Sequence, residues 1–413
     1  MSLASAISNN IIYYEPDSTY SDSTIFDSVY SALQNQQNGM ENLSNQFLQT
    51  GIDHYQNKRY DEAAKAFEAS IAIAPNSTYN VDTTKYLSQT YLKLEKPEKA
   101  FDTYKSAIDR NPTSDDLRTS LAQLYYVEEE YEEAAAQYKA AVQINPSSTN
   151  RYSYGESLLK VENYTEAEYQ FREVRRLEPE SYAGDYGLGK LFSQTKAYDE
   201  AIEHFEKALK LSPEFYDALA EIGYTYADKG DIESAREIQA DLEDLDEDLS
   251  GTLLSYIGEK EPPKFDFAFA NSSFPYNASK GYEVSAIDAY LENAGVEKSL
   301  TMKFMFSKEM DPASVENRIN WSISRASSGN IAKTYNFGDA IPETEVTLDS
   351  IPDYVLYDPD TYTATLGFTI RQNETADGTI DPSHIVFKFD GKDVYGQAMD
   401  NKGDEFSGFS KIA

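Results

Sequence analysis

The chain has 413 residues, no cysteine and a formal net charge of -35, and 40% of its residues are hydrophobic. It is longer than one compact core usually is, so two or more structural units are expected. Charge of this sign repels phosphate backbones and anionic lipids, which argues against nucleic acid and membrane surfaces as partners. Without cysteine there is no disulfide, catalytic thiolate or cysteine-bound zinc. No apolar run is long enough to span a bilayer, so no membrane insertion is expected.

Residues 1–43 are predicted to form an N-terminal tail or assembly arm. They are polar, with apolar islands at 11–14 and at Ile25, Val29 and Leu33. The opening MSLASAISNN lacks the basic and apolar regions of a standard signal peptide. Two interpretations stay open. The segment is either a tail with one short helix that caps the first repeated unit, or an arm whose NIIYY stretch adds as a strand to a neighbour's sheet edge.

Residues 44–249 repeat one amphipathic phrase, seen in RYDEAAKAFEASIAIAP (59–75) and AYDEAIEHFEKALKLSP (197–213). Its alanines lie 37, 34, 33, 34 and 34 residues apart, at Ala63, Ala100, Ala134, Ala167, Ala201 and Ala235. In the first five units a ring follows four residues after the alanine and a proline ends the unit. The alanine lets two helices approach, and the ring fills the space beside it. A period of this length predicts stacked pairs of helices.

The pattern resembles the tetratricopeptide repeat. This resemblance implies an α-solenoid of six repeats, in which the sixth, with Gln239 in place of the ring, acts as a cap. It also implies a concave groove lined by the first helix of each pair. The groove positions carried over are Asn45, Leu48, Ile52, Tyr55, Asp82, Lys85, Gln89, Leu92, Asp116, Thr119, Gln123, Tyr126, Tyr152, Glu156, Leu159, Tyr186, Lys190, Ser193, Asp217, Ala220 and Tyr224.

Seven of these positions are the groove-binding candidates: Tyr55, Lys85, Tyr126, Tyr152, Tyr186, Lys190 and Tyr224. Some tetratricopeptide proteins clamp a peptide's terminal carboxylate with Lys and Asn in the first repeat, where this chain has Leu48 and Ile52. That mode is therefore not expected. The tyrosines are either a binding stripe or the solvated rim of an unused groove.

After residue 250 the pattern changes. Residues 250–299 are predicted to be a linker with one short helix at 284–295. Strands are then expected at 300–307, 319–324, 345–350, 362–370 and 384–390, because these runs are alternating, β-branched or aromatic and end at turn residues. Such short strands predict an all-β sandwich over residues 300–413.

Residues 304–324 resemble the bacterial Ig-like domains of surface and secreted proteins. The matching motif is F-S-x-x-M-D-P-x-S-V, carried by Phe306, Ser307, Met310, Asp311, Pro312, Ser314 and Val315. A G-x-D-x-x-G turn occurs further on, at Gly391, Asp393 and Gly396. The resemblance implies an Ig-like fold and a surface-associated protein.

Few residues suggest chemistry. His54, His204 and His384 lie in separate segments, so a histidine triad or metal cluster is not expected. Asp390, Asp393, Asp400 and Asp404 are weak calcium candidates, with ordinary solvated turn acids as the favoured interpretation. Otherwise no cofactor or metal is expected. Glycosylation sequons occur at Asn42, Asn76, Asn163, Asn271, Asn277, Asn320 and Asn373.

The sequence therefore favours a non-catalytic, structural or protein-binding protein over an enzyme, because no nucleophile, base and oxyanion set is found. Its expected partners are proteins, either copies of itself or a client peptide. Within this class we favour an exported surface or filament-forming subunit, extracellular and self-assembling through its arm, repeats and Ig-like domain. The alternative is an intracellular adaptor that binds a client peptide in the groove. An enzyme would have to be an acid-pair hydrolase in the β domain.

Overall fold

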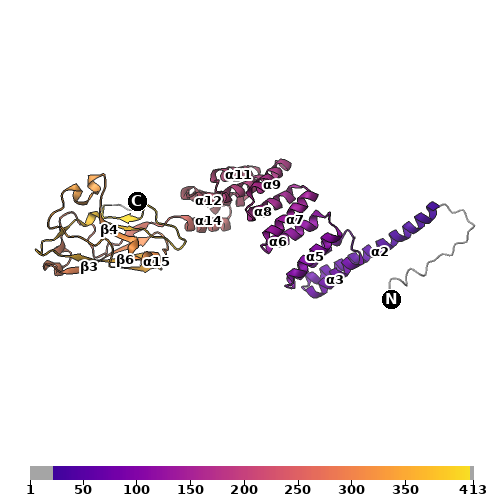
Figure 1. Ribbon diagram of the computed structural model, residues 1–413, viewed down its shortest axis with the longest axis horizontal. Helices are drawn as coiled ribbons and strands as arrows, with labels where there is room; N and C mark the ends of the chain where they lie inside the picture. Colours follow the sequence, from indigo (N-terminus) through magenta and orange to yellow (C-terminus); the bar gives the residue numbers. More distant parts are fainter. Residues whose placement is uncertain (1–21, 410–413) are drawn as a thin grey trace, which may run out of the picture. The chain divides into compact units, whose positions relative to one another are not determined.

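The computed structural model describes residues 22–409, so the NIIYY segment at 10–14 lies outside the described residues. The chain divides into two compact units, which we describe separately. Unit 1 holds nine helices in its described residues: α2 (Asp22–Gln56), α3 (Tyr60–Ile73), α4 (Asn80–Lys93), α5 (Pro97–Arg110), α6 (Asp115–Val127), α7 (Tyr131–Ile144), α8 (Ser148–Lys160), α9 (Tyr164–Leu177) and α10 (Ala183–Gln194). Consecutive helices pack as antiparallel pairs (Figure 1).

Unit 2 continues the helical series and adds the β region. Its helices are α11 (Tyr198–Leu211), most of which falls in this unit, α12 (Tyr216–Lys229), α13 (Ile232–Glu243) and α14 (Glu247–Lys260). None of the helices in the described part of the chain is both long and apolar enough to cross a bilayer.

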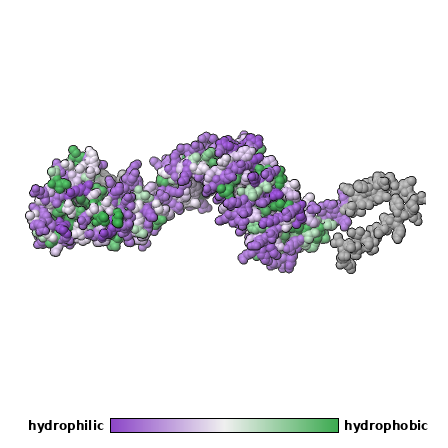
Figure 2. All heavy atoms as spheres, viewed as in Figure 1, coloured by the Kyte–Doolittle hydropathy of each residue, from purple (hydrophilic) through white to green (hydrophobic). Residues whose placement is uncertain are grey.

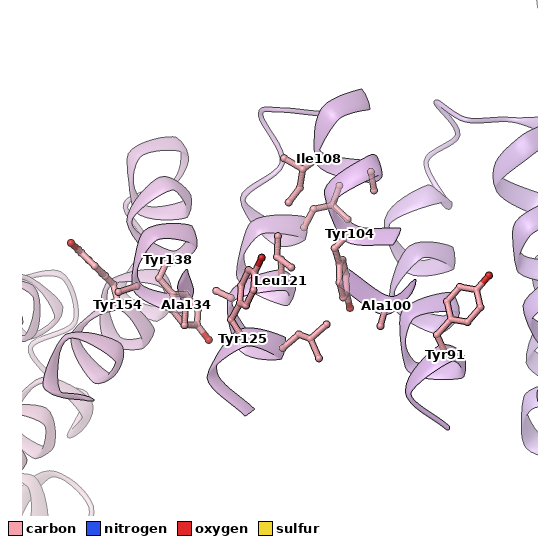
Figure 3. Packing of buried hydrophobic residues seen from close by; sticks show 14 of the residues in the cluster. Tyr91, Ala100, Tyr104, Ile108, Leu121, Tyr125, Ala134, Tyr138 and Tyr154 are labelled. Carbon is pink, nitrogen blue, oxygen red and sulfur yellow. The ribbon is translucent and has the colours of Figure 1, made fainter. Parts of the chain in front are cut away.

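The repeat core is built from contacts between small residues and rings. Ala63, Ala100 and Ala134 are fully buried, and tyrosines and leucines fill the spaces between neighbouring helices (Figure 3). Phe171 of α9 has no exposed surface. A Cβ added at Gly155 of α8 would lie 2.6 Å from its ring, and one added at Gly187 of α10 would lie 2.3 Å from it. The ring thus packs against two glycines, which leave no room for a side chain.

Every repeat turns at a residue with left-handed backbone. Lys58, Glu95, Glu129, Glu162 and Lys196 have φ between 57° and 63°, and Gly230 has φ 85°. These positions follow the same spacing as the repeated alanines. In five of the six turns a hydrogen bond of 2.9 Å closes the turn back onto the first helix, as from the Asn163 amide to the Leu158 carbonyl. A non-glycine residue in this region costs about 1 kcal/mol, which the buried helix pair must offset.

The β region contains nine strands in its described residues: β1 (Phe265–Ala268), β2 (Tyr282–Glu283), β3 (Glu297–Phe306), β4 (Trp321–Arg325), β5 (Tyr354–Asp358), β6 (Thr363–Arg371), β7 (Thr379–Ile380), β8 (Ile385–Phe389) and β9 (Glu405–Phe406). All pair antiparallel, in sheets of order β1-β3-β6-β5, β2-β7 and β4-β8-β9. Short helical turns connect them: η1 (Val284–Ala286), η2 (Ala289–Glu292), α15 (Pro312–Val315), η3 (Arg318–Asn320), η4 (Ile331–Lys333), η5 (Tyr335–Gly338) and η6 (Pro382–His384).

One aromatic core holds these sheets together. Trp321 is 1% exposed, and its ring centroid lies 4.5 Å from that of Phe389 and 5.9 Å from that of Phe265. The indole donates a 2.7 Å hydrogen bond to the carbonyl of Val315, at the end of α15. Asp311 caps this one-turn helix by accepting from the Ala313 amide, which gives the D-P-x-S-V motif a structural role. The Ig-like assignment itself stays a prediction.

Several elements differ from the predicted boundaries. Helix α2 begins at Asp22, inside the 1–43 segment for which one short helix was an open interpretation, and it continues through the first repeat to Gln56. Residues 247–260, partly assigned to a linker, form a thirteenth helix of the described series. β1 pairs with β3, so the chain from 265 onward is part of the β region. The helix expected at 284–295 is two short 3-10 turns. Position 239 carries Gln where the earlier repeats have a ring, and Gln239 donates a 2.9 Å hydrogen bond to Ser250 of α14.

Two strand predictions also differ. Residues 345–350 are extended but form no strand, because they bond to two different sheets: Ile323 donates to the Ser350 carbonyl, and Val346 donates to the Thr379 carbonyl. β5 was not predicted. It lies at a sheet edge, where Arg318 bonds the Asp353 carbonyl and Glu316 accepts from the Tyr357 amide. These contacts cover part of an edge that an assembly arm would need.

We predict that Gly187→Val lowers the stability of unit 1 by about 1–3 kcal/mol, because the new side chain overlaps the Phe171 ring and overpacks a core shared by two repeats. Thermal unfolding followed by circular dichroism measures the change. The control is Gly251→Ala on α14, where a Cβ meets nothing within 4 Å and where alanine favours the helix. An unchanged melting temperature for Gly187→Val would show that the ring does not depend on this contact.

Candidate functional site

The first helices of neighbouring repeats in unit 1 lie side by side and form one wall, which we call the first-helix wall (α4, α6, α8 and α10). Polar contacts join each helix to the next. Lys85 of α4 lies 2.9 Å from Asp116 of α6. Thr119 of α6 lies 3.4 Å from Asn150 of α8, and Glu156 of α8 pairs with Lys190 of α10. Residues predicted for the groove therefore do meet between neighbouring repeats, 31 residues apart for Lys85 and Asp116 and 34 for Glu156 and Lys190.

Tyrosines are the main aromatic residues of this wall. Tyr126, Tyr152 and Tyr186 are each partly buried. Burial, and then the charge of Glu156, raises the pKa of Tyr126 to about 12, and the same two causes raise the pKa of Tyr152. These hydroxyls stay protonated at neutral pH and can donate hydrogen bonds. Tyr152 also packs on Phe171, with ring centroids 5.6 Å apart, so it contributes to the core as well.

Helix α2 adds Tyr55 at one end of the wall. Its ring lies edge-on to Tyr86 of α4, with centroids 6.3 Å apart, and burial raises its pKa. Sequence reasoning missed Tyr86, which stacks on Phe67 at 5.6 Å. The sequence signal for Tyr86 was its position one residue after Lys85, on the same helical turn.

The lysines of the wall have carboxylate partners in the chain itself. Lys85 bonds both oxygens of Asp116 at 2.9 Å, and Lys190 bonds Glu156 while lying over the Tyr186 ring at 5.7 Å. The Lys190 and Glu156 side chains are only 26% and 19% exposed. Because both charges are already neutralised, these lysines do not form a free clamp for a carboxylate or phosphate.

Other predicted positions lie elsewhere. Leu48, Leu159 and Ala220 are 4%, 3% and 1% exposed, so they are core residues and not groove residues. Tyr224 belongs to unit 2, where its ring lies edge-on to Tyr256 of α14 at 5.0 Å. Burial, and then Glu221, raises the pKa of Tyr224.

A separate cleft of about 560 Å³ opens between the second helices α3 and α5, over α4. Leu87 and Tyr91 form its floor, and Glu68, Lys99 and Arg110 lie at its rim. The Tyr91 hydroxyl donates to Glu68. The first period of the repeat is three residues longer than the next, and the extra residues fall in the α3–α4 connection beside this cleft. This insertion was the only feature of the sequence that pointed to the cleft.

Models of the tetratricopeptide repeat match residues 87–114, 153–214 and 192–249, and the model of anaphase-promoting complex (cyclosome) subunit 3 matches residues 106–174. The helical part of this chain is an array of tetratricopeptide repeats. No curated protein matches the chain.

Several solved tetratricopeptide structures are similar to this array. A tetratricopeptide protein from Parabacteroides merdae is 19% identical over 53% of this chain and 89% of its own, with a TM-score of 0.46. YrrB, described as having an unusual peptide-binding site, is 22% identical over 46% and 99%, with a TM-score of 0.36. PilF of Pseudomonas aeruginosa is 16% identical over 52% and 99%, with a TM-score of 0.41.

The calcium candidates are not brought together. Asp393 lies 2.6 Å from Lys308, Asp404 lies 2.8 Å from Lys388, and Asp400 accepts from the Lys402 amide. Across residues 22–409, no three acidic or histidine side chains are arranged to hold a metal ion. Lysines thus pair with two of these carboxylates, which leaves less negative charge for a cation.

The sequons differ in accessibility. Asn320 donates its side-chain amide to the Ser314 carbonyl at 2.8 Å, and Asn373 donates its amide to Asp377 at 2.8 Å. A sugar would replace one of the two hydrogens on each of these amide nitrogens, at an atom that already has a partner in the fold. The remaining five side chains, which are exposed, are Asn42, Asn76, Asn163, Asn271 and Asn277.

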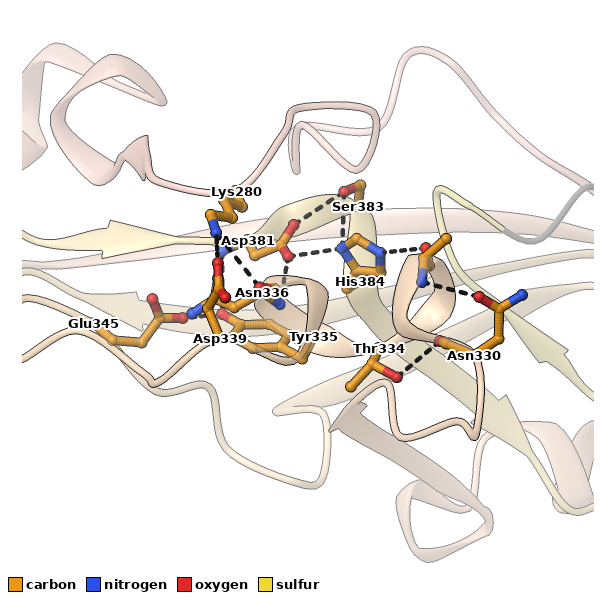
Figure 4. Close-up of polar contacts among 11 residues, drawn as sticks. Lys280, Asn330, Thr334, Tyr335, Asn336, Asp339, Glu345, Asp381, Ser383 and His384 are labelled. Atoms are coloured by element: carbon orange, nitrogen blue, oxygen red, sulfur yellow. Dashed lines mark hydrogen bonds and ion pairs between the residues drawn. The ribbon is translucent and has the colours of Figure 1, made fainter.

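His384 was expected to stand apart, but the fold places it in a buried polar cluster (Figure 4). Its Nδ1 lies 2.7 Å from Asp381 Oδ2, and its Nε2 faces the Ala332 carbonyl at 3.2 Å. Ser383 donates to Asp381 at 3.0 Å and approaches the same Nδ1. Both imidazole nitrogens are therefore occupied, and Ser383 is only 3% exposed. The grouping contains a serine, a histidine and an aspartate, but its geometry is that of a structural link and not of a nucleophile relay.

The same cluster continues to Glu345, whose side chain is 2% exposed. Tyr335 donates its hydroxyl to Glu345 and accepts from the Asp381 amide. Burial raises the pKa of Glu345 from 4.5 to about 7, opposed by Arg325 and reinforced by Asp381. The network ties the long connection between β4 and β5 to β8. No sequence pattern indicated this network, because its members lie far apart in the chain.

The β region is predicted to lose stability as the pH rises from about 4.5 to about 7. The folded state binds the Glu345 proton more tightly than the unfolded chain does, so ionisation costs the folded state of order 2 kcal/mol. Glu345→Gln keeps an acceptor for Tyr335 and should remove this part of the pH dependence in denaturant unfolding. Glu297→Gln, which removes the same charge at a 48% exposed site, should retain it. Equal pH profiles for the two variants would contradict the assignment.

Proposed function

We propose that this is a non-catalytic protein-binding protein, and that the first-helix wall of unit 1 binds an extended peptide segment of its partner. The observation that carries the proposal is the row of partly buried tyrosines, Tyr55, Tyr86, Tyr126, Tyr152 and Tyr186. Such rings offer large rigid contact area at small entropic cost, and their protonated hydroxyls can donate to a peptide backbone. The comparisons indicate no enzyme family.

The charge pattern of the wall restricts the partner. Lys85 and Lys190 are held by Asp116 and Glu156, so an acidic tail would gain no free cation and would meet a chain of net charge -35. A neutral or basic segment with apolar or aromatic side chains fits better, because it can pack against the tyrosines without repulsion.

A finer proposal concerns location. We favour an exported surface or filament-forming subunit, with an intracellular adaptor as the alternative. The resemblance of the β region to surface domains and the exposure of Asn271 and Asn277 support this choice. Mass spectrometry of the native protein tests this choice, because glycans on these two residues would establish export. Protease treatment of intact cells then tests surface location, because a surface protein should be cleaved.

The peptide proposal is tested with a probe selected from a displayed peptide library on the immobilised full chain. The affinity of the labelled peptide is then measured by fluorescence anisotropy. Tyr126→Ala and Tyr186→Ala should each weaken binding about tenfold, the equivalent of about 1.4 kcal/mol for a lost ring contact.

The matched control is Tyr169→Ala, which removes a 52% exposed ring from the second helix α9. It should leave the affinity unchanged, and circular dichroism should show that all three variants keep their helices. If the two wall variants bind as well as the control, the peptide does not use this wall. Tyr152 is not used in this test because it packs on Phe171.

A further inference from the structure

Helix α2 is far longer than the repeat that it opens. It spans 35 residues, whereas the other helices of unit 1 have 12–14. Its later part packs into the core: Ser44 bonds Ser70 of α3, and Leu48 is 4% exposed. Residues 34–40 of the helix are all exposed. The helix spans about 30 Å over residues 22–43, before Ser44.

This extension is poorly suited to stand alone. Isolated helices of this length are marginal in water even with good helix formers. Residues 34–39 read QNQQNG, in which the two asparagines and the glycine are weak helix formers, and a Cβ at Gly39 would meet nothing within 4 Å. Packing against another helix would stabilise a helix of this composition.

The sequence of the extension carries an apolar heptad seam. The seam consists of Phe26, Val29, Leu33, Met40, Leu43 and Phe47. Its one polar position, between Leu33 and Met40, is Gln36. Where side chains are described, the seam is open on the side away from the core: Met40 is 42% exposed and Leu43 is 44% exposed. The spacing of this seam is the pattern that pairs two helices.

The seam is symmetric about Gln36. In an antiparallel pairing centred there, position 29 faces 43, position 33 faces 39 and 40, and the two Gln36 amides face each other. Residues 28–40 contain no charged side chain, although the whole chain carries -35. This uncharged stretch is where two copies can approach with least repulsion, and an antiparallel arrangement directs the two acidic repeat arrays to opposite ends.

We propose that α2 pairs with α2 of a second copy, antiparallel and centred on Gln36, so that the protein is a two-fold symmetric dimer. The pairing closes on itself and so makes dimers, in contrast to the open contact expected of a strand-adding arm. It goes beyond peptide binding and does not depend on it, because Tyr55, the one binding candidate on α2, lies near the far end of that helix, 19 residues after Gln36.

The first test measures the mass of the full chain by sedimentation velocity in a dilution series that starts at about 50 µM, because the dimer fraction depends on concentration. The full chain should be a dimer. Met40→Glu with Leu43→Glu should be a monomer, with unchanged melting of the repeats because both side chains are exposed. The control Val127→Glu changes a 70% exposed residue of α6 and should stay dimeric. A monomeric full chain, or a double variant that remains dimeric, overturns the proposal.

The second test determines whether the two α2 helices run antiparallel. Because the chain has no cysteine, any disulfide must form between the introduced residues. Val29→Cys mixed with Leu43→Cys should form a disulfide-linked heterodimer on mild oxidation. Gln36→Cys should link to itself. Leu43→Cys alone should not, and if it links while the mixture does not, the helices are parallel and the proposed arrangement is wrong. The variant with Met40→Glu and Leu43→Glu should still bind the selected peptide, because both changes lie on α2 outside the first-helix wall, which separates this proposal from the peptide-binding function.

Discussion

The close contact between a small residue on one helix and a ring on the next sets the geometry of the helical part. Phe171 lies between Gly155 of its own repeat and Gly187 of the following one, and neither position has room for a methyl group. Because the ring belongs to one repeat and is covered by two, each repeat buries its apolar face only when its neighbour is present. The stability of each repeat therefore depends on the repeats next to it.

This repeated spacing also determines what the first-helix wall can do. It brings residues of neighbouring repeats into contact, which joins Lys85 to Asp116 and Lys190 to Glu156. The ion pairs remove the cations that a carboxylate clamp would use and leave the tyrosines as the distinctive chemistry of the surface. In Figure 2 the visible surface of the helices is mostly hydrophilic, with small apolar areas between them. A partner must therefore be recognised by fit and hydrogen bonding more than by one large apolar patch.

The β region follows a different principle, since its core is aromatic and its polar groups are buried in pairs. Trp321 and its neighbouring rings hold the sheets, while the cluster of His384, Asp381, Tyr335 and Glu345 fastens a long irregular connection. Buried polar groups of this kind need every partner satisfied. The cluster therefore specifies the path of residues 326–346 even though most of that path is neither helix nor strand.

The sequence alone determined the helical pairs, because the spacing of Ala, ring and Pro is a local property of each helix and turn. It also located most of the longer strands. It could not show that Leu48 and Leu159 are core residues, that Lys85 and Lys190 are neutralised, or that Ser383 and Asp381 bond His384. It did not show that a further helix, α14, follows the repeats and that its Ser250 bonds Gln239. These features depend on residues brought together across a period or across the sheets, and only the tertiary structure decides such neighbours.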